Sequence, residues 1–280
     1  MPLKHCLIHA NCQGGQLERY LLASPDFRRA FRVARRTNYL REAVSDEEIG
    51  GCDLFLYQEL GEQWGDLASE KLLKRLSPSA VAVRIPNLFF KGYWPFWTTN
   101  SPFVEFGDVL LDRLLAEGAP KTAIMRIYLH TDIQAYVNLQ EIFEKTIAFE
   151  RRKEENTAIK TVDYLIEHWK SRRLFHTHNH PGRELLALVA QDILRMLDLP
   201  GLRRDHLRDA DNKPDEEAYA VMDLPIHPQV GAFFNLPFAG PETQYNVYGR
   251  RMTFAGYISR YIDCRMNGLE KDFIGYLQLV

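Results

Sequence analysis

The chain has 280 residues, the length of one large α/β domain or of two average domains. Hydrophobic residues make up 46% of it and charged residues 26%, so the sequence is too apolar to be intrinsically disordered. The formal net charge of -2 excludes a global positive field of the kind that draws proteins onto nucleic acid or anionic membranes.

The amino-terminal residues MPLKHCLIHANC are interrupted by polar side chains, which leaves no room for the apolar core of a signal peptide. No apolar run approaches the roughly 18 residues that a membrane-spanning helix needs. The four cysteines are scattered and form no C-x-x-C pair, which argues against a disulfide framework and against a cysteine-rich zinc site. These features predict a soluble, cytoplasmic protein.

The first ninety residues alternate between strand and helix patterns. Residues 3–10 form an apolar run that predicts a strand, residues 11–15 predict a tight glycine turn, and residues 16–23 have apolar side chains at helical spacing. Further strands are predicted over 31–34, 53–57 and 80–86, with a helix over 69–76. This alternation favours an α/β fold with a mainly parallel sheet flanked by helices, in which ligands bind at the carboxyl ends of the strands.

The rest of the chain is expected to be largely helical. Helical periodicity marks residues 104–117, 132–173, 183–197 and about 250–265. The charge run within 132–173 predicts a solvated helix face, and residues 200–218 predict a linker or surface loop. We therefore expect an α/β core over residues 1–200 that includes a helical insertion at 104–173, and an irregular carboxyl-terminal extension over 201–280 that packs on this core.

The segment NCQGG at residues 11–15 stands where the first strand gives way to a helix. A cysteine there lies beside a helix amino terminus, which lowers a thiol pKa and supplies backbone N–H groups for an oxyanion or a phosphate. The two flanking carboxamides are costly to bury without partners, so they should face solvent, a ligand or a hydrogen-bonding network. The alternative is a small buried cysteine beside a glycine turn.

Three histidines alternate in the segment HTHNHP at residues 176–181, directly before a predicted helix. Alternation puts the three side chains on one face, but the segment lacks the further ligand of a zinc pattern, so metal binding is the weaker interpretation. His180 is the better candidate for a general base, because Pro181 in the first helical turn would fix the direction of the preceding imidazole. A histidine cluster without a role is the alternative.

The segment RIPN at residues 84–87 leaves a predicted strand at its carboxyl end and leads into an aromatic loop. Asn87 could supply a side-chain donor to a ligand at this place. Side chains of the loop that could cover an adenine or a sugar are those of Lys91, Tyr93, Trp94 and Trp97. The competing interpretation is that the rings form a small hydrophobic core under the loop.

A strand that ends in Asn-Cys-Gln-Gly, a later Pro-Asn segment followed by Gly-Tyr-Trp-Pro, and a His-Pro pair before a helix make the chain resemble the WcbI-type polysaccharide biosynthesis family, best over the first 200 residues. The resemblance implies a flavodoxin-like α/β core similar to that of the SGNH hydrolases. It also implies binding of coenzyme A and acetyl-coenzyme A, O-acetyltransferase activity, and an association with capsular polysaccharide biosynthesis.

In SGNH hydrolases the first motif presents a serine after strand one, a later loop gives an asparagine to the oxyanion hole, and a D-x-x-H-P segment supplies the base. By position, the resemblance puts Cys12 in place of the serine, Asn87 in place of the asparagine and His180 in place of the histidine. The chain has no G-D-S motif, and Thr177 stands where the aspartate would be. One of the two residues before His180, or a distant acid, must therefore orient its ring.

We accordingly expect an acyltransferase that moves acetyl from acetyl-coenzyme A to a hydroxyl of a sugar or polysaccharide precursor, with Cys12, His180 and Asn87 as catalytic residues. The residues expected to contact the coenzyme are Asn11, Gln13, Gly14, Arg84, Lys91 and His178, with Arg35 and Arg36 as further candidates for its phosphates. Two alternatives stay open: a cysteine-dependent esterase or deacetylase with water as acceptor, and a non-catalytic carbohydrate-binding protein that uses the aromatic loop.

Overall fold

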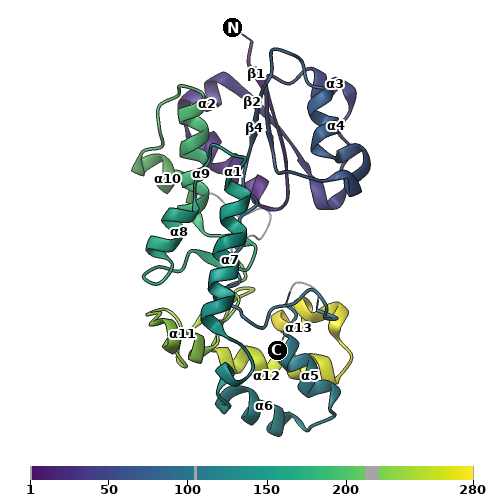
Figure 1. Cartoon of the computed structure of the whole chain (residues 1–280), viewed down its shortest axis with the longest axis vertical. Helices are drawn as coiled ribbons and strands as arrows, with labels where there is room; N and C mark the ends of the chain where they lie inside the picture. The colour runs from purple at the N-terminus through teal and green to yellow at the C-terminus, as the bar shows by residue number, and fades with distance from the viewer. Residues whose placement is uncertain (1, 104–105, 212–220, 280) are drawn as a thin grey trace. The chain divides into compact units, whose positions relative to one another are not determined.

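The computed structural model describes residues 2–103, 106–211 and 221–279, which form two compact units (Figure 1). The sheet unit comprises residues 2–89, 149–166 and 180–211, and the helical unit comprises residues 90–103, 106–148, 167–179 and 221–279. The chain passes from one unit to the other inside α7 (Leu139–Glu154) and inside α8 (Val162–His168). The boundary expected after residue 200 does not coincide with this division.

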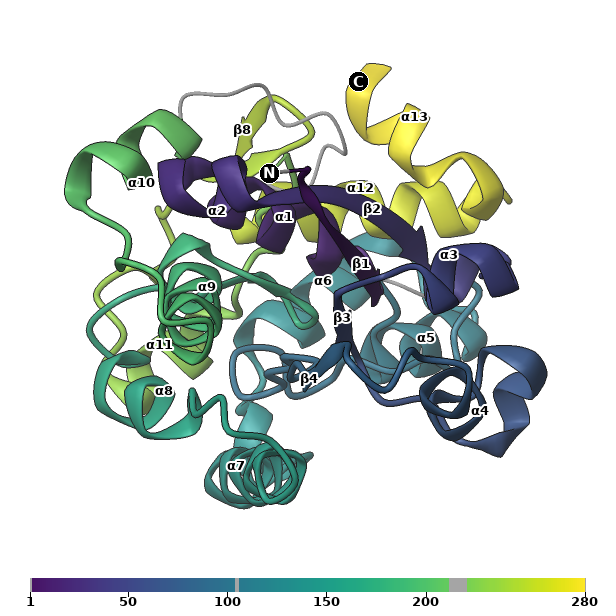
Figure 2. The same cartoon turned by 90° about the horizontal axis from the view of Figure 1, so that it is seen from above.

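Four parallel strands form the sheet of the sheet unit, in the order β2-β1-β3-β4. These strands are β1 (Lys4–Ala10), β2 (Phe31–Thr37), β3 (Leu54–Tyr57) and β4 (Val81–Arg84). Figure 2 shows α1 (Gln13–Ala23), α2 (Pro25–Ala30) and α9 (Arg183–Met196) on one face and α3 (Asp46–Gly50) and α4 (Ser69–Lys74) on the other. The α/β fold expected from the sequence is thus confirmed.

Strand β1 is the centre of this sheet. Its residues Cys6 to Ala10 are all buried, because helices cover both faces and a strand pairs with each edge. On one face, Leu7 and Phe55 pack in an apolar cluster that includes Ile49 and Leu72 from the α3 and α4 side. On the other face α1 begins directly against β1: a Cβ on Gly14 would lie 3.0 Å from Cβ of Ala10, so a larger residue would require the helix or the strand to shift.

The strand order places a topological switch at β1, since the chain continues to β2 on one side of it and to β3 on the other. In doubly wound sheets such a switch opens a crevice at the carboxyl ends of the strands, where ligands bind. The segments that follow β1, β3 and β4 therefore define the part of the sheet unit where a site is to be sought.

The helical unit contains α5 (Val109–Ala116), α6 (Lys121–His130), α11 (Pro228–Phe234), α12 (Phe254–Met266), α13 (Phe273–Leu279), and the strands β5 (Phe175–Thr177), β7 (Tyr245–Val247) and β8 (Arg250–Met252). Its core holds the rings of the loop that follows β4. Tyr93 is fully buried and donates its hydroxyl to the carbonyl of Trp169 at 2.6 Å, and Trp94 donates Nε1 to the carbonyl of Leu224 at 3.1 Å. The core interpretation is therefore correct for these two rings, which cannot form an exposed sugar platform.

Several expected elements differ from the observed ones. The single helix expected over 132–173 is wrong, because α7 and α8 are separate helices that the segment 155–161 divides. The loop expected over 200–218 contains α10 (Arg204–Asp211), and the part of it beyond residue 211 lies outside the described residues. No helix in the described parts of the chain is long and apolar enough to cross a lipid bilayer.

Candidate active site

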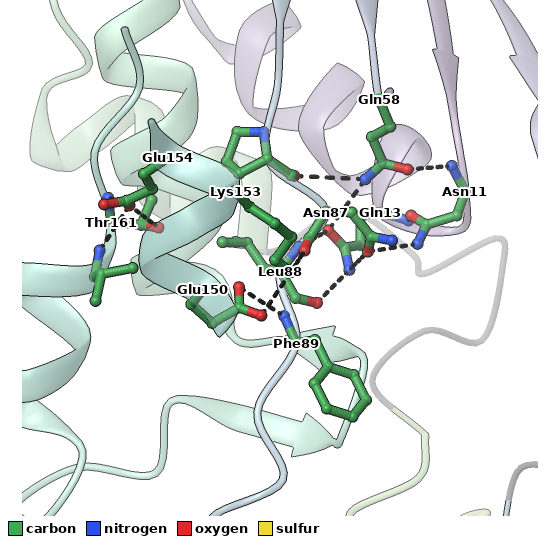
Figure 3. Close-up of polar contacts among 12 residues, drawn as sticks. Asn11, Gln13, Gln58, Asn87, Leu88, Phe89, Glu150, Lys153, Glu154 and Thr161 are labelled. Atoms are coloured by element: carbon green, nitrogen blue, oxygen red, sulfur yellow. Dashed lines mark hydrogen bonds and ion pairs between the residues drawn. The ribbon is translucent and has the colours of Figure 1, made fainter. Parts of the chain in front are cut away.

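Four carboxamide side chains gather at the carboxyl edge of the sheet (Figure 3), those of Asn11, Gln13, Gln58 and Asn87, and three of these residues follow strands directly or closely. Asn11 follows β1, Gln58 follows β3, and Asn87 comes shortly after the end of β4. These three strands are neighbours in the sheet, so their parallel course brings the three side chains to one edge.

Gln58 connects the end of β3 to the turn that follows β1. Its main-chain N–H donates to the carbonyl of His9 at 3.0 Å, and its Oε1 accepts the main-chain N–H of Asn11 at 2.8 Å. Only 2% of Gln58 is exposed. Sequence reasoning missed this residue, although its place directly after β3 is the same signal that marked Asn11 after β1.

Gln13 binds the segment that leaves β4. Its Nε2 donates to the carbonyl of Leu88 at 2.8 Å, and its Oε1 accepts the N–H of Leu88 at 3.1 Å. One carboxamide therefore binds both main-chain polar groups of Leu88. Oε1 also accepts from Nε2 of Gln58 at 3.4 Å. Because Gln13 is 3% exposed and bonded at both ends, its observed role is to hold this segment, and its contact with a coenzyme stays a prediction.

Asn87 is exposed, yet its side chain has a defined orientation. Its Oδ1 accepts from Nδ2 of Asn11 at 3.1 Å and from Nε2 of Gln13 at 3.3 Å. No acceptor for Nδ2 of Asn87 lies among the residues that the structure describes. With the oxygen occupied, the two N–H groups of this amide are directed to solvent and can donate to a ligand.

Cys12 stands at the N-cap of α1 in a helical conformation, with φ -52° and ψ -22°. None of the four cysteines forms a disulfide, and Cys12 is partly exposed while Cys6, Cys52 and Cys264 are buried. The alternative of a small buried cysteine at residue 12 is therefore wrong. Cys12 thus presents a partly exposed thiol directly before the first turn of α1.

The backbone donors that were expected to stabilise an oxyanion have other partners. The N–H of Gln13 donates to Oδ1 of Asn11 at 2.9 Å, and the N–H of Gly14 donates to the carbonyl of Asn11 at 2.9 Å. The expectation is wrong for these two groups because the turn after β1 uses Asn11 to close itself. The N–H groups of Asn87 are the donors that this arrangement leaves to a ligand.

His180 begins the short strand β6 (His180–Pro181) in the sheet unit and is partly buried. The proline expected in the first helical turn is not there, because Gly182 is the N-cap and α9 begins at Arg183. Cys12 precedes α1 and His180 precedes α9, and these two helices pack against each other.

Two residues expected at the coenzyme lie in the helical unit. His178 is 5% exposed, and its ring stacks on that of Trp97 with 3.8 Å between the ring centroids. Lys91 is partly buried, and burial lowers its pKa. The sheet unit contains the three expected catalytic residues, Cys12, Asn87 and His180.

The arginines expected at coenzyme phosphates are ion-paired inside the sheet unit. Arg84 pairs with Glu59, and Arg36 pairs with Glu48. Nε of Arg35 lies 3.3 Å from Glu18. Each of these arginines already neutralises a carboxylate, and their role at a coenzyme stays a prediction.

The charge run near residue 150 is not a solvated face throughout. Glu150 and Glu154 are 3% and 4% exposed, which overturns the expectation for these two residues. Burial raises the pKa of Glu150 to about 7, against the opposing effects of Lys153 and of the Phe89 N–H. Nζ of Lys153 lies 2.5 Å from Glu150 and also donates to the carbonyl of Asn87. Sequence reasoning missed these residues, because a charge run does not reveal which of its faces is covered.

A histidine–carboxylate pair lies in the helical unit, where Nδ1 of His176 is 2.8 Å from Oδ1 of Asp223. Burial alone would raise the pKa of Asp223, but the hydrogen bond with His176 and the charge of Arg173 lower it. The two residues are 47 positions apart, so no local motif marks the pair. In the described parts of the chain, no three His, Cys, Asp or Glu side chains are grouped as a metal site requires.

Two comparisons with known proteins agree with this architecture. The family model for the polysaccharide biosynthesis enzyme WcbI matches residues 5–202. A solved structure of WcbI, described as a novel polysaccharide biosynthesis enzyme in its native form without the disulfide bond between coenzyme A and one of its cysteines, superposes with a TM-score of 0.75. The two chains are 18% identical, and the similarity covers 99% of this chain and 94% of the other.

No curated protein sequence matches the chain. The structural likeness, at this low identity, shows a shared fold, and the family model carries the relationship in sequence. Because that model matches well over half of the residues, including the segments that follow β1, β3 and β4, the chain belongs to the WcbI family of polysaccharide biosynthesis enzymes.

Proposed function

We propose that the protein is an O-acyltransferase that moves acetyl from acetyl-coenzyme A to a hydroxyl of a sugar in polysaccharide biosynthesis. Membership of the family supports the sugar-containing acceptor, and the coenzyme A–cysteine disulfide named for the WcbI structure supports coenzyme A as the partner. The observation that carries the proposal is the orientation of the Asn87 amide. Asn11 and Gln13, the two sequence neighbours of Cys12, both donate to its oxygen, which leaves its N–H groups for a ligand.

In a covalent route, the thiolate of Cys12 attacks the thioester carbonyl, and the carbon–sulfur bond to coenzyme A breaks. Coenzyme A leaves as its thiolate and takes up a proton, while the acetyl group stays on Cys12. The acceptor hydroxyl then gives its proton to His180 and attacks the acetyl-cysteine, and the Cys12 thiolate is released. Each step passes through a tetrahedral oxyanion.

In a direct route, Cys12 only positions the thioester. The acceptor hydroxyl gives its proton to His180 and attacks the carbonyl of acetyl-coenzyme A. The tetrahedral oxyanion then collapses, the carbon–sulfur bond breaks, and His180 gives the proton to the coenzyme A thiolate. Both routes need a donor for the oxyanion, and in both the N–H groups of Asn87 would supply it. One well-placed donor of this kind contributes about 3 kcal/mol to transition-state stabilisation.

The intact mass of the protein after rapid mixing with acetyl-coenzyme A tests the role of Cys12. The covalent route predicts an added acetyl group on the wild-type chain and none on Cys12→Ser. If the wild-type chain carries no adduct at any time while acetyl is being transferred, the covalent route is wrong and the direct route is left.

Replacement of the other two residues tests the shared chemistry. Asn87→Ala should lower kcat by about a hundredfold, the usual effect of losing one oxyanion donor, without a matching loss of coenzyme affinity. His180→Ala should lower kcat as well, and a wild-type rate in this variant would remove His180 as the base. If the protein releases free acetate, forms no acetylated sugar and does not bind coenzyme A, the transferase proposal is wrong and the esterase or deacetylase alternative is supported.

A further inference from the structure

The segment that carries Asn87 has an irregular backbone that is held by side chains. Residues 85–89 follow β4 without regular secondary structure. Thr157 donates its hydroxyl to the carbonyl of Arg84 at 2.6 Å, and Gln13 binds both polar groups of Leu88. Main-chain groups that have no strand or helix partner must be satisfied in some other way, so these side chains determine the course of the segment.

The last turns of α7 bind the same segment on both sides of Leu88. Lys153 donates Nζ to the carbonyl of Asn87, and Oε2 of Glu150 accepts the N–H of Phe89 at 3.4 Å (Figure 3). The two side chains are themselves ion-paired at 2.5 Å, with 3% of the Glu150 side chain and 21% of the Lys153 side chain exposed. A charge pair that is this well covered has a defined geometry, unlike a pair on an open surface.

We propose that Glu150 and Lys153 are positioning residues for the reaction: their ion pair fixes the main chain on both sides of Leu88 and thereby aims the amide of Asn87. This inference rests on the proposed function, because it assigns Asn87 to the oxyanion. Asn11 and Gln13 hold only the side-chain oxygen of Asn87, whereas Lys153 holds its main-chain carbonyl. Loss of the ion pair releases the carbonyl of Asn87 and the N–H of Phe89, while Gln13 still holds Leu88 between them. Displacement of a catalytic group by about 1 Å is enough to lower a rate by about a hundredfold.

The chain offers a matched control on the same helix. Glu154 is also buried, and its Oε1 accepts the N–H of Val162 at 2.8 Å and the hydroxyl of Thr161 at 2.9 Å. It therefore supports the start of α8 and makes no bond to residues 85–89 among the contacts described for these residues. Glu154→Gln removes a buried carboxylate from the same helix, so it should destabilise the protein. It should not change the position of Asn87.

The experiment compares the full-length wild-type chain with Lys153→Met, Lys153→Arg and Glu154→Gln. The double variant Glu150→Gln/Lys153→Met removes both charges and so avoids an unpaired buried carboxylate that could prevent folding. Two quantities are measured: the acetyl-transfer kinetics, and the hydrogen-exchange rates of the main-chain N–H groups of residues 88 and 89.

We expect Lys153→Met and the double variant to lower kcat by about tenfold or more, with KM for acetyl-coenzyme A changed by less than about twofold. Exchange at residues 88 and 89 should become faster in both, and Lys153→Arg should restore most of the rate. Glu154→Gln should keep the wild-type kcat and the wild-type exchange at these residues.

The inference is overturned by unchanged exchange at residues 88 and 89 in Lys153→Met and in the double variant, and equally by a matching loss of kcat in Glu154→Gln. If the wild-type chain transfers no acetyl group, the proposed function fails and the exchange rates alone decide whether the ion pair holds the segment. If exchange becomes faster but kcat is unchanged, the ion pair holds the segment without serving catalysis, and the positioning role is wrong.

Discussion

The orientation of Asn87 is a property of residues far from it in the chain. Asn11 and Gln13 are 76 and 74 positions away, and both donate to the same oxygen. A carboxamide on its own can present its oxygen or its nitrogen to a ligand. Because both donors bond the oxygen of Asn87, its nitrogen is the group presented to a ligand. The sequence could indicate only that Asn87 follows a strand end.

His9 is a second residue whose environment has a measurable effect. It is fully buried, and neither ring nitrogen has a hydrogen-bond partner among the described residues. Burial lowers its pKa from 6.5 to about 4, although Glu42 acts in the opposite direction. Between pH 6.5 and pH 4, His9 is protonated in the unfolded chain and neutral in the folded chain. The free energy of unfolding therefore decreases as the pH falls from about 6.5 towards 4.

We predict that His9→Phe makes the protein less sensitive to acid. Phenylalanine keeps a ring beside Phe55, which His9 faces with 6.5 Å between centroids, and it has no proton to gain. The drop in the free energy of unfolding from pH 7 to pH 4.5 should be smaller than in the wild type by about 2 kcal/mol. Urea unfolding at the two pH values measures it, and equal drops in the two proteins would mean that His9 is not the group that titrates.

At the scale of elements, the sequence predicts what local patterns encode. The strand and the helix at the start of the chain are confirmed because their apolar periodicity lies within about twenty residues. The glycine turn expected over residues 11–15 is wrong in part, because α1 already begins at Gln13 and contains Gly14 and Gly15. The break between α7 and α8 was not predicted, since it depends on Glu154, which binds the first N–H groups of α8 from the preceding helix. The same limit explains why Asn11 and Asn87 were found at strand ends and the covered pair Glu150–Lys153 was not.

Gly14 gives a test of how closely α1 must approach the sheet. A Cβ there would lie 3.0 Å from Ala10 Cβ and 3.4 Å from Ile8 Cγ2. We predict that Gly14→Val lowers the free energy of unfolding by about 2 kcal/mol through this overpacking, as small-to-large substitutions in close-packed cores do. Gly256→Ala on α12, where the added Cβ has 3.4 Å to its nearest neighbour, is the control and should have a much smaller effect in thermal or denaturant unfolding. Equal stability of Gly14→Val and the wild type would show that the helix can move away from the strand.

At the scale of the whole molecule, the division into two units has no counterpart in composition. The chain passes between the units inside α7 and α8, which are ordinary helices without a proline-rich or glycine-rich linker. The sequence therefore predicted a single domain boundary, after residue 200, whereas the chain crosses between the units at several points. The family model ends at residue 202, yet the likeness to the WcbI structure covers 99% of this chain. The shared fold therefore extends beyond the residues that the family model matches.

The proposed coenzyme should stabilise the whole molecule. A ligand that binds only the folded state raises the free energy of unfolding by about 2.7 kcal/mol at a concentration of 100 Kd. We predict that coenzyme A raises Tm by several degrees in the presence of a reductant, which prevents a mixed disulfide from forming. Cys12→Ser should keep most of this shift if binding is non-covalent, and an unchanged Tm of the wild type at saturating coenzyme would remove coenzyme A from the proposal.

The uneven burial of the cysteines also makes the natural chain suitable for spectroscopy. Cys6, Cys52 and Cys264 are 1%, 4% and 0% exposed, and burial raises the pKa of both Cys52 and Cys264 to about 11. A maleimide dye should therefore attach at residue 12 without prior removal of the other thiols. Its fluorescence would then report on events at the start of α1 in the unmutated protein, on the time scale of a stopped-flow experiment.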